Sequence, residues 1–426
     1  EEKRRLFLQR EKETAFAVAA EYFHQALRLA RGESPETGSP GLDYARQRRF
    51  TDETLRAAGV GFFGKAWSDL REALRTAGVD LECPAAVALV GYRGDVRAWG
   101  EQYGIEPAAQ WIEAGKIKAL PPNLLIYPHT LHARVVYLSG RYIAPAGDGP
   151  KSWNPPSALV GERAPYVNWL WGRAKPESGE STFPYSVIVE GQACALTLGQ
   201  WGIPALAMAG CDLGERPDAQ HPVLVQVQRQ LNLTEGRAVL GLDQDTAGAA
   251  GTPKLAAALL NLLGLKATAF HAVAWPQVDV NAWLQAGGTA AEARTLLAQA
   301  PTWIDILLEN ARPAEDAAEG NDRAVRTLFN ALAELDVYDV ARMREKISHT
   351  LQMKRSLFDT LLKAARQDTG LDDDGKPKYV TLGGRLCHRF YDGHGNEIFT
   401  PLCNFTAHTC SPKTAAHIPS PRIPAT

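Results

Sequence analysis

Residues 185–207 read YSVIVEGQACALTLGQWGIPALA, and residues 237–248 read RAVLGLDQDTAG. Each stretch contains a continuous apolar run, Ser186 to Val189 in the first and Ala238 to Leu242 in the second, and an acid follows each run. Strands of a parallel sheet that are covered on both faces read as such runs, whereas half-exposed strands alternate. The two stretches therefore predict an α/β fold with a doubly wound parallel sheet.

The acids after these runs predict a metal site. Glu190 follows the first run, Asp243 and Asp245 follow the second, and Asp279 comes after a third apolar run, Ala269 to Ala274. Acids at the carboxyl ends of parallel strands point into the crevice where α/β folds bind ligands. One such acid alone is more often a helix N-cap. Several strand–acid units in succession favour an oxygen-only site, which suits Mg²⁺ or Mn²⁺ better than zinc.

This arrangement resembles the TOPRIM fold that bacterial primases, topoisomerases and some nucleases share. Glu190 and the glycine after it resemble the first TOPRIM motif, and Asp243 and Asp245 resemble the Asp-x-Asp metal ligands. Asp279 resembles a further acid of bacterial-type primases; the next acid of that motif is replaced here by Asn281, whose amide oxygen can still coordinate. The resemblance implies that Glu190, Asp243 and Asp245 are catalytic and that, with Asp279, they hold Mg²⁺ or Mn²⁺.

Two segments before these acids distinguish among TOPRIM proteins. Residues 41–74, GLDYARQRRFTDETLRAAGVGFFGKAWSDLREAL, resemble the start of the catalytic core of bacterial, DnaG-like DNA primases. Residues 123–156, NLLIYPHTLHARVVYLSGRYIAPAGDGPKSWNPP, resemble the basic subdomain of that core. The combination implies a DnaG-like primase core. Residues 379–405, which end in PLCNF, resemble the connector that precedes the motor in phage and mobile-element primase-helicases.

Four residues of the second segment are predicted to bind nucleic acid or nucleotide. Arg141 and Lys151 are suited to phosphate contacts, and Asn154 to a hydrogen bond with a nucleotide or its backbone. Trp153 is suited to stacking on a base. Without the resemblance, the two cations would be read as ordinary solvated charges beside a turn.

Two other clusters are interpreted as structural. Arg46, Arg48 and Arg49 are read as a solvated helix face. His129 and His132 have a spacing that metal ligands use, but no third ligand lies nearby in the sequence, so this segment is expected to be a turn.

A chain of 426 residues exceeds one ordinary domain. We expect, in order, an N-terminal helix and linker (1–40), a mixed α+β basic subdomain (41–180), a TOPRIM catalytic domain (181–300), a helical module (301–370), and a β-hairpin connector with a disordered tail (371–426).

Composition and missing motifs limit the possible partners, location and additional domains of the chain. The net charge of −2 neither supports nor excludes a nucleic-acid partner. Six cysteines without a Cys-x-x-Cys pair indicate reduced thiols and a cytoplasmic location, in a bacterial or phage-infected cell. The sequence has no apolar run of membrane-spanning length, no zinc-ribbon cysteine set and no phosphate loop of a helicase motor. We expect it to be the central portion of a longer replication protein.

The expected function is that of a DNA primase, a nucleotidyltransferase that makes short RNA primers on single-stranded DNA. Its expected partners are the template, nucleoside triphosphates, and a replicative helicase or a helicase domain in the same polypeptide. One alternative is a TOPRIM-type nuclease, which shares the acids but does not need Arg141 and Lys151. The other is a non-catalytic nucleic-acid-binding module whose acids are structural.

Overall fold

Strand β6 (Ser186–Val189) is the central strand of a five-stranded sheet with the order β5-β7-β6-β8-β9. Strands β7 (Ala205–Ala207), β8 (Ala238–Leu240) and β9 (Phe270–Ala272) continue its parallel ladder, and β5 (Tyr166–Val167) pairs antiparallel with β7 at one edge. Every residue of β6, β7 and β8 is buried. The predicted α/β fold with a buried parallel sheet is confirmed.

The computed structural model describes residues 2–27, 39–64, 66–144, 150–172, 185–208, 221–231, 237–263, 270–312, 318–333, 335 and 337–368, with the backbone of 379–382, 385–391 and 397–401. The chain divides into two units. The first comprises Glu1–Leu265 and Ala269–Pro301, and the second comprises Lys266–Thr268 and Thr302–Thr426. The expected disordered tail lies outside the described residues.

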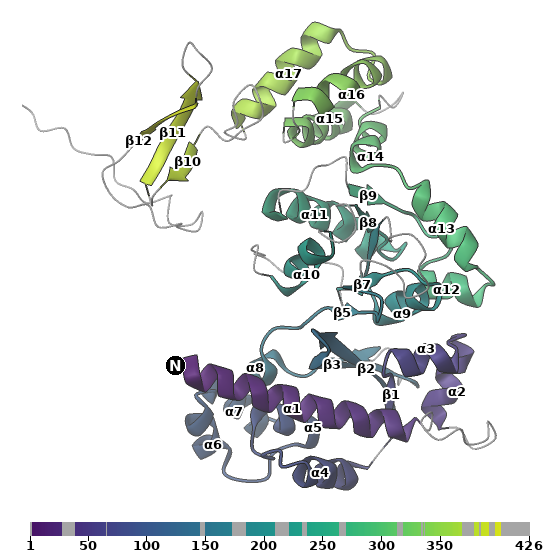
Figure 1. The fold of residues 1–426 in the computed structure, drawn as a ribbon, viewed down its shortest axis with the longest axis vertical. Coiled ribbons are helices and arrows are strands. Elements are labelled where there is room, and N and C mark those ends of the chain that lie inside the picture. The colour runs from purple at the N-terminus through teal and green to yellow at the C-terminus, as the bar shows by residue number, and fades with distance from the viewer. Residues whose placement is uncertain are drawn as a thin grey trace, which may run out of the picture. The chain divides into compact units, whose positions relative to one another are not determined.

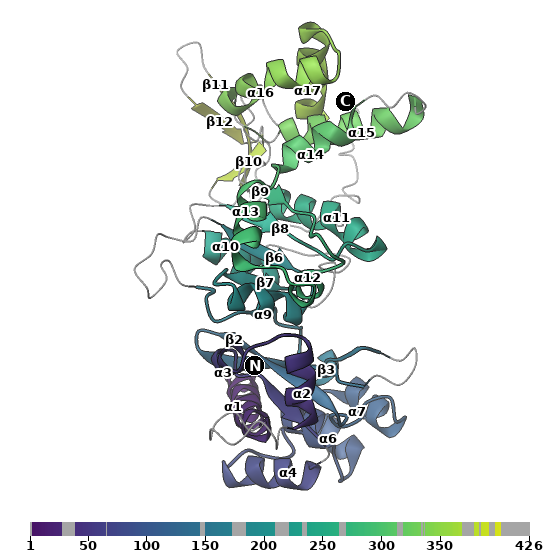
Figure 2. The same cartoon turned by 90° about the vertical axis from the view of Figure 1, so that its right-hand side faces the viewer.

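Helices cover both faces of the five-stranded sheet. Helices α9 (Gln192–Gln200), α12 (Val280–Gln285) and α13 (Ala290–Ala298) lie on one side, and α10 (Pro222–Leu231) and α11 (Thr246–Leu263) lie on the other (Figure 1). Figure 2 views the molecule from the side of α12 and α13, which lie in front of the sheet. This is the doubly wound arrangement expected from the alternation of strands and helices.

The N-terminal half of this unit is built on a second, antiparallel sheet. Its strands lie in the order β1 (Gly61–Phe63), β2 (Leu124–Leu131), β3 (Arg134–Tyr142) and β4 (Ser152–Trp153). Helix α1 (Glu2–Ala26) runs along β1 and β3 (Figure 1). Only a glycine fits at Gly61, where a Cβ would lie 2.5 Å from the Cβ of Phe23. The remaining helices of this half are α2 (Pro40–Gln47), α3 (Asp52–Ala57), α4 (Trp67–Thr76), α5 (Pro84–Val90), α6 (Val96–Tyr103), α7 (Glu106–Glu113) and α8 (Ser157–Val160).

Both faces of the antiparallel sheet are buried, each in a different hydrophobic cluster. Leu124 and Ile126 of β2 pack into the cluster that contains helices α1, α4 and α5. Leu125 and Tyr127, whose side chains point the other way, pack into a cluster that also contains Val187 and Val189 of β6. The antiparallel sheet therefore shares one hydrophobic core with the parallel sheet.

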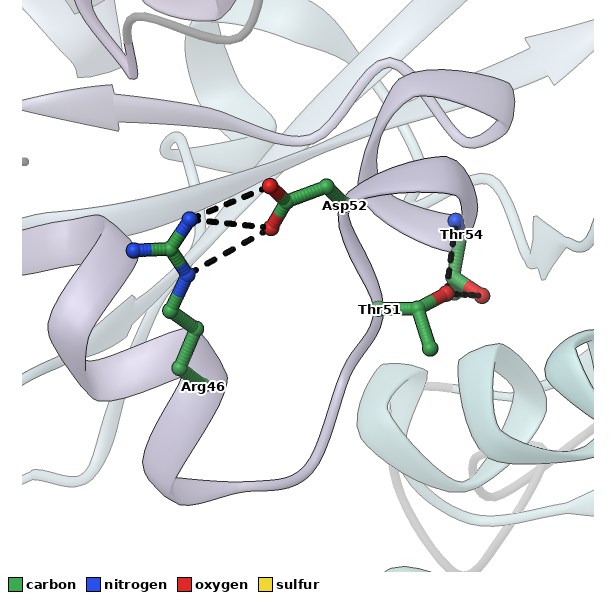
Figure 3. A network of polar contacts seen from close by, with 4 residues as sticks. All are labelled: Arg46, Thr51, Asp52 and Thr54. Atoms are coloured by element: carbon green, nitrogen blue, oxygen red, sulfur yellow. Dashed lines mark hydrogen bonds and ion pairs between the residues drawn. The ribbon is translucent and has the colours of Figure 1, made fainter. Parts of the chain in front are cut away.

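The basic cluster on α2 is not simply a solvated face. Arg46 forms an ion pair with Asp52 at 3.0 Å, next to the Thr51 side chain that caps α3 (Figure 3). Arg48 is half-buried, with its guanidinium carbon 5.4 Å from the ring centroid of Tyr44. The solvated-face prediction is therefore wrong for Arg46 and Arg48, because both cations have specific partners.

The prediction that His129 lies in a turn is wrong, because the turn comes three residues later. His129 belongs to β2 and is fully buried, and the chain reverses at His132 and Ala133, which have φ values of 52° and 61°. Burial lowers the pKa of His129 to about 4, so its imidazole is neutral at neutral pH. Among the described residues, no helix is long and apolar enough to cross a bilayer.

The second unit contains helices and a small sheet. Phe329 and Phe358, on two different helices, pack edge to face with ring centroids 5.1 Å apart. The Lys346 ammonium lies 2.6 Å from the Asp305 carboxylate. The elements are α14 (Trp303–Asn310), α15 (Ala318–Ala333), α16 (Val337–Thr350), α17 (Arg355–Asp368), β10 (Tyr379–Leu382), β11 (Arg385–Tyr391) and β12 (Glu397–Pro401), with the three strands antiparallel in that order.

Candidate active site

The predicted acids gather at the carboxyl edge of the parallel sheet. Glu190 directly follows β6, Asp243 follows β8, and Asp279 is the N-cap of α12 after β9. The backbone N–H of Gln244 donates to the carbonyl of Val278 at 2.6 Å, and this bond joins the loop of Asp243 to the loop of Asp279. Segments far apart in sequence therefore deliver carboxylates to one place.

A thiol completes the cluster. The Cys194 sulfur and one carboxylate oxygen each of Asp243 and Asp279 all lie within 4.8 Å of one another. Cys194 is buried in α9, and burial, followed by the charges of Asp279 and Asp243, raises its thiol pKa well above the usual range. A thiol with so high a pKa stays neutral, and a neutral thiol is a poor ligand for Mg²⁺ or Mn²⁺, so the oxygen-only site stays a prediction. The sequence did not predict Cys194 as part of this cluster, because only the folded chain brings α9 next to Asp243 and Asp279.

The acids repel one another. Burial, and then the charges of Glu190, Asp279 and Asp245, raise the pKa of Asp243 to about 7. Burial, then Asp245 and Asp279, also raise the pKa of Glu190. Like charges held together in a partly desolvated place raise each other's pKa values in this way, and a divalent cation would relieve the repulsion.

The residues present fit such a cation. Among the described residues, Glu190 Oε2 is buried and has no hydrogen-bond partner, an arrangement that is unfavourable unless a ligand takes the oxygen. A Cβ built on Gly191 would meet no atom within 4 Å, so the space beside Glu190 is open. Helix α9 starts at Gln192 without a side-chain cap, which leaves its N-terminal N–H groups facing the same region.

Asp245 and Asp279 also cap helices. Asp245 Oδ1 accepts a hydrogen bond of 2.8 Å from the Gly248 N–H at the start of α11, and Asp279 Oδ1 accepts one of 2.6 Å from Ala282 N–H. A Cβ at Gly248 would lie 2.0 Å from the Asp243 carbonyl oxygen, so the turn requires glycine. Capping uses one oxygen of each carboxylate and leaves the other available.

Asn281 is not available as a ligand. Its Oδ1 accepts hydrogen bonds from Arg48 at 2.7 Å and from Gln285 at 3.0 Å, and its Nδ2 donates to Thr197 at 3.1 Å and to the Arg48 carbonyl at 3.3 Å. The amide is fully buried. The suggestion that its oxygen can coordinate is therefore wrong. Asn281 and Arg48 instead hold α12 against the C-terminal end of α2.

Of the four predicted nucleic-acid-binding residues, Arg141 is the one whose charge acts on an acid of the cluster. It lies on β3, is half-buried, and lowers the pKa of Asp243 against the other influences. It pairs across the sheet with Leu125 and Ser152, so it shares the face of Leu125 that points toward the parallel sheet.

The other three lie on or beside β4. Lys151 is exposed, and its carbonyl accepts a hydrogen bond from Tyr142 N–H at 3.2 Å. Trp153 pairs with Gly140 and packs against the cluster of Leu124 and Ile126, on the opposite face from Arg141. Asn154 is half-buried, and its Oδ1 has no hydrogen-bond partner among the described residues. Their binding roles stay predictions.

Sequence and fold comparisons point to one group of proteins. No family model matches the chain. It is 26% identical over 348 residues to the DNA primase of Deinococcus radiodurans, a match that covers 78% of this chain and 53% of that protein. The chain thus spans about half the length of this relative.

Two solved structures have the same fold. The RNA polymerase domain of Mycobacterium tuberculosis primase DnaG, in complex with a double-stranded DNA oligomer with a 6-nucleotide overhang, matches with a TM-score of 0.55 and 19% identity, over 80% of this chain and 97% of that one. The zinc-binding and RNA polymerase domains of the Aquifex aeolicus primase match with a TM-score of 0.56 and 16% identity, over 82% and 74%. The chain is related in sequence to a DNA primase, and it has the fold of a DnaG-like primase catalytic core.

Proposed function

We propose that this chain is the catalytic core of a DNA primase, which joins ribonucleotides into short primers on a single-stranded DNA template. The observation that carries the proposal is that the acids of the parallel sheet and a cation of the antiparallel sheet influence one another. Glu190, Asp243 and Asp279 gather at the carboxyl edge of the parallel sheet, and Arg141, on the face of β3 that points toward that sheet, acts on Asp243 by its charge. Acids beside a phosphate-binding cation are the parts that nucleotidyl transfer requires.

The chain's own residues divide the work. Glu190, Asp243 and Asp279, with Asp245 beside them, would hold Mg²⁺ or Mn²⁺, which when bound activates the attacking oxygen and neutralises the leaving pyrophosphate. Asp243 must lose a proton to bind, because its pKa is raised to about 7. Arg141 is placed to orient a phosphate of the template or the incoming nucleotide.

The test is primer synthesis by the purified chain. We expect short products from an unprimed DNA strand, ribonucleoside triphosphates and Mn²⁺ or Mg²⁺, with more product when a dinucleotide is supplied. A dinucleotide should help because the sequence carries no zinc-ribbon cysteine set to assist initiation.

The competing functions predict different products. Degradation of the strand without nucleotide-dependent extension would support the TOPRIM nuclease. DNA binding with neither reaction, once metal binding has been measured, would support the non-catalytic module. The M. tuberculosis domain was solved with DNA, which supports a DNA template here as well. A helicase partner, a phage or mobile-element origin and a cytoplasmic location stay predictions.

A further inference from the structure

Three side chains link the centre of the antiparallel sheet to the start of helix α9. His129 Nδ1 lies 2.7 Å from the Ala164 carbonyl oxygen, and His129 Nε2 lies 2.8 Å from Ser139 Oγ. Gln192 Nε2 donates to the same Ser139 oxygen at 3.0 Å. His129 and Ser139 are buried, and Gln192 is the first residue of α9. We call these three residues the relay.

The donor and acceptor of each hydrogen bond in the relay can be assigned in only one way. The Ala164 carbonyl can only accept, so the neutral imidazole carries its proton on Nδ1 and its Nε2 is an acceptor. The Ser139 hydroxyl must then donate to His129, which leaves its oxygen to accept from Gln192. Each of the three bonds therefore fixes the role of the next, and a buried network satisfied in this way is rigid.

The relay joins the two sides of the candidate site. Gln192 is two residues after Glu190, whose Oε2 has no hydrogen-bond partner among the described residues to hold it. Ser139 is two residues before Arg141 on β3, so both side chains lie on the same face of that strand. The bond between Gln192 and Ser139 therefore holds the Glu190 turn against β3, the strand that carries Arg141, whose charge acts on Asp243.

We propose that His129, Ser139 and Gln192 are positioning residues that set the placement of Glu190 relative to Arg141. The inference rests on the proposed function, because only a reaction that uses both groups needs their spacing. Removing a partner that hydrogen-bonds a metal ligand directly costs about 10- to 100-fold. These three residues act on Glu190 through the backbone of its turn, so we expect a loss at the lower end of that range.

Helix α9 offers a matched control at its other end. Gln200 also connects α9 to the N-terminal half: its Oε1 accepts from Thr51 N–H at 2.9 Å, and its Nε2 donates to the Arg49 carbonyl at 3.1 Å. Gln192→Met and Gln200→Met make the same chemical change, and each removes one bridge. Only the first lies beside Glu190, so a general loss of α9 anchoring should affect both variants alike.

The experiment compares these variants with Ser139→Ala by two readouts. The first is hydrogen exchange of residues 188–198, which needs no activity. We expect faster exchange near Glu190 in Gln192→Met and Ser139→Ala, and no change there in Gln200→Met. The second is primer synthesis. We expect kcat to fall about tenfold in the first two variants, with the nucleotide KM nearly unchanged, and the double variant to be no worse than either single variant.

The exchange measurement tests the relay, and primer synthesis tests the positioning role, so each can be contradicted separately. Unchanged exchange near Glu190 in Gln192→Met would overturn the relay, whatever the enzyme does. Faster exchange with a wild-type kcat, or an equal loss of kcat in Gln200→Met, would overturn the positioning role. If the wild-type chain made no primers, the proposed function would fail, while the exchange measurement would still decide whether the relay holds the start of α9.

Discussion

The two sheets of the first unit carry their polar groups in different places. The parallel strands are apolar except for Ser186 in β6 and His271 in β9, and the acids Glu190 and Asp243 come after the strands end. The antiparallel sheet carries His129, Ser139 and Arg141 within its strands, on the face that meets the shared core. Side chains just after the ends of parallel strands are accessible to ligands and solvent. Polar side chains within buried strands instead need hydrogen-bond partners from neighbouring residues. The parallel sheet thus supplies reactive groups, and the antiparallel sheet supplies groups that hold and orient.

The largest expected effect tests the strand-end acids. Glu190→Gln and Asp243→Asn should each reduce primer synthesis by more than about 100-fold, beyond what removal of an outer hydrogen bond causes. Neither side chain fills the hydrophobic core, so circular dichroism should be unchanged. Activity near the wild-type level in either variant would mean that these acids do not form the site.

Arg141 and Lys151 test whether position within the antiparallel sheet matters. If each contacts one phosphate, Arg141→Ala and Lys151→Ala should each lower the slope of log affinity against log salt by about 0.7 for single-stranded DNA. Arg141→Ala should also move metal binding to higher pH, because Arg141 lowers the pKa of Asp243. Lys151 is exposed and should have no such effect. Titrations at several salt concentrations and pH values would decide, and unchanged slopes would return both residues to ordinary surface charges.

Trp153 tests whether a side chain of this sheet packs or binds. Because its half-buried ring packs on a hydrophobic cluster, Trp153→Ala should lower the free energy of unfolding by about 2 kcal/mol, less than full burial of a tryptophan would imply. Trp153→Leu should recover most of that loss by urea denaturation. If Trp153→Leu were stable yet lost most of its DNA affinity, the ring would be acting as a stacking platform, as its sequence context predicted.

The smallest effect concerns stability without metal. The pKa of Asp243 is raised from an ordinary 3.8 to about 7, so the folded state holds this proton more tightly than the unfolded chain. The contribution to stability is full below about pH 4 and is lost as the pH rises through 7. Asp243→Asn carries no charge, so at pH 8 with chelator it should melt a few degrees above the wild type. The gap should close toward pH 4, and a variant that melted lower at pH 8 would contradict the repulsion.

The sequence predicted the parallel sheet and its acids because both signals are local. A covered parallel strand is a continuous apolar run, and the acid is the next residue or nearly so. Residues 84–90 could not be assigned in the same way. All seven residues of α5 are buried, so the segment has no polar face to reveal a helical period.

Non-local partners explain what the sequence did not predict. Arg48 looks like any surface cation until Asn281, 233 positions away, accepts its hydrogen bond. His129 looks like a turn residue because the carbonyl of Ala164 and the hydroxyl of Ser139, which satisfy its ring, belong to other segments. Cys194 joins the acids only because α9, α12 and the loop after β8 meet. Residue propensities and sequence spacing contain no information about these long-range contacts.

The shared hydrophobic cluster has a consequence for synthesis of the protein. It draws on residues from Leu27 to Ala300, so it cannot close until nearly the whole first unit has left the ribosome. Helix α1 is made before β3, one of the elements it packs against, which lies more than 100 residues later and follows on the order of 5–20 s afterwards at usual translation rates. During that interval Phe16, which is fully buried in the finished fold, lacks its edge-to-face partner Tyr137 of β3. The nascent chain should therefore depend on chaperones, and slow translation should lengthen its exposure to aggregation.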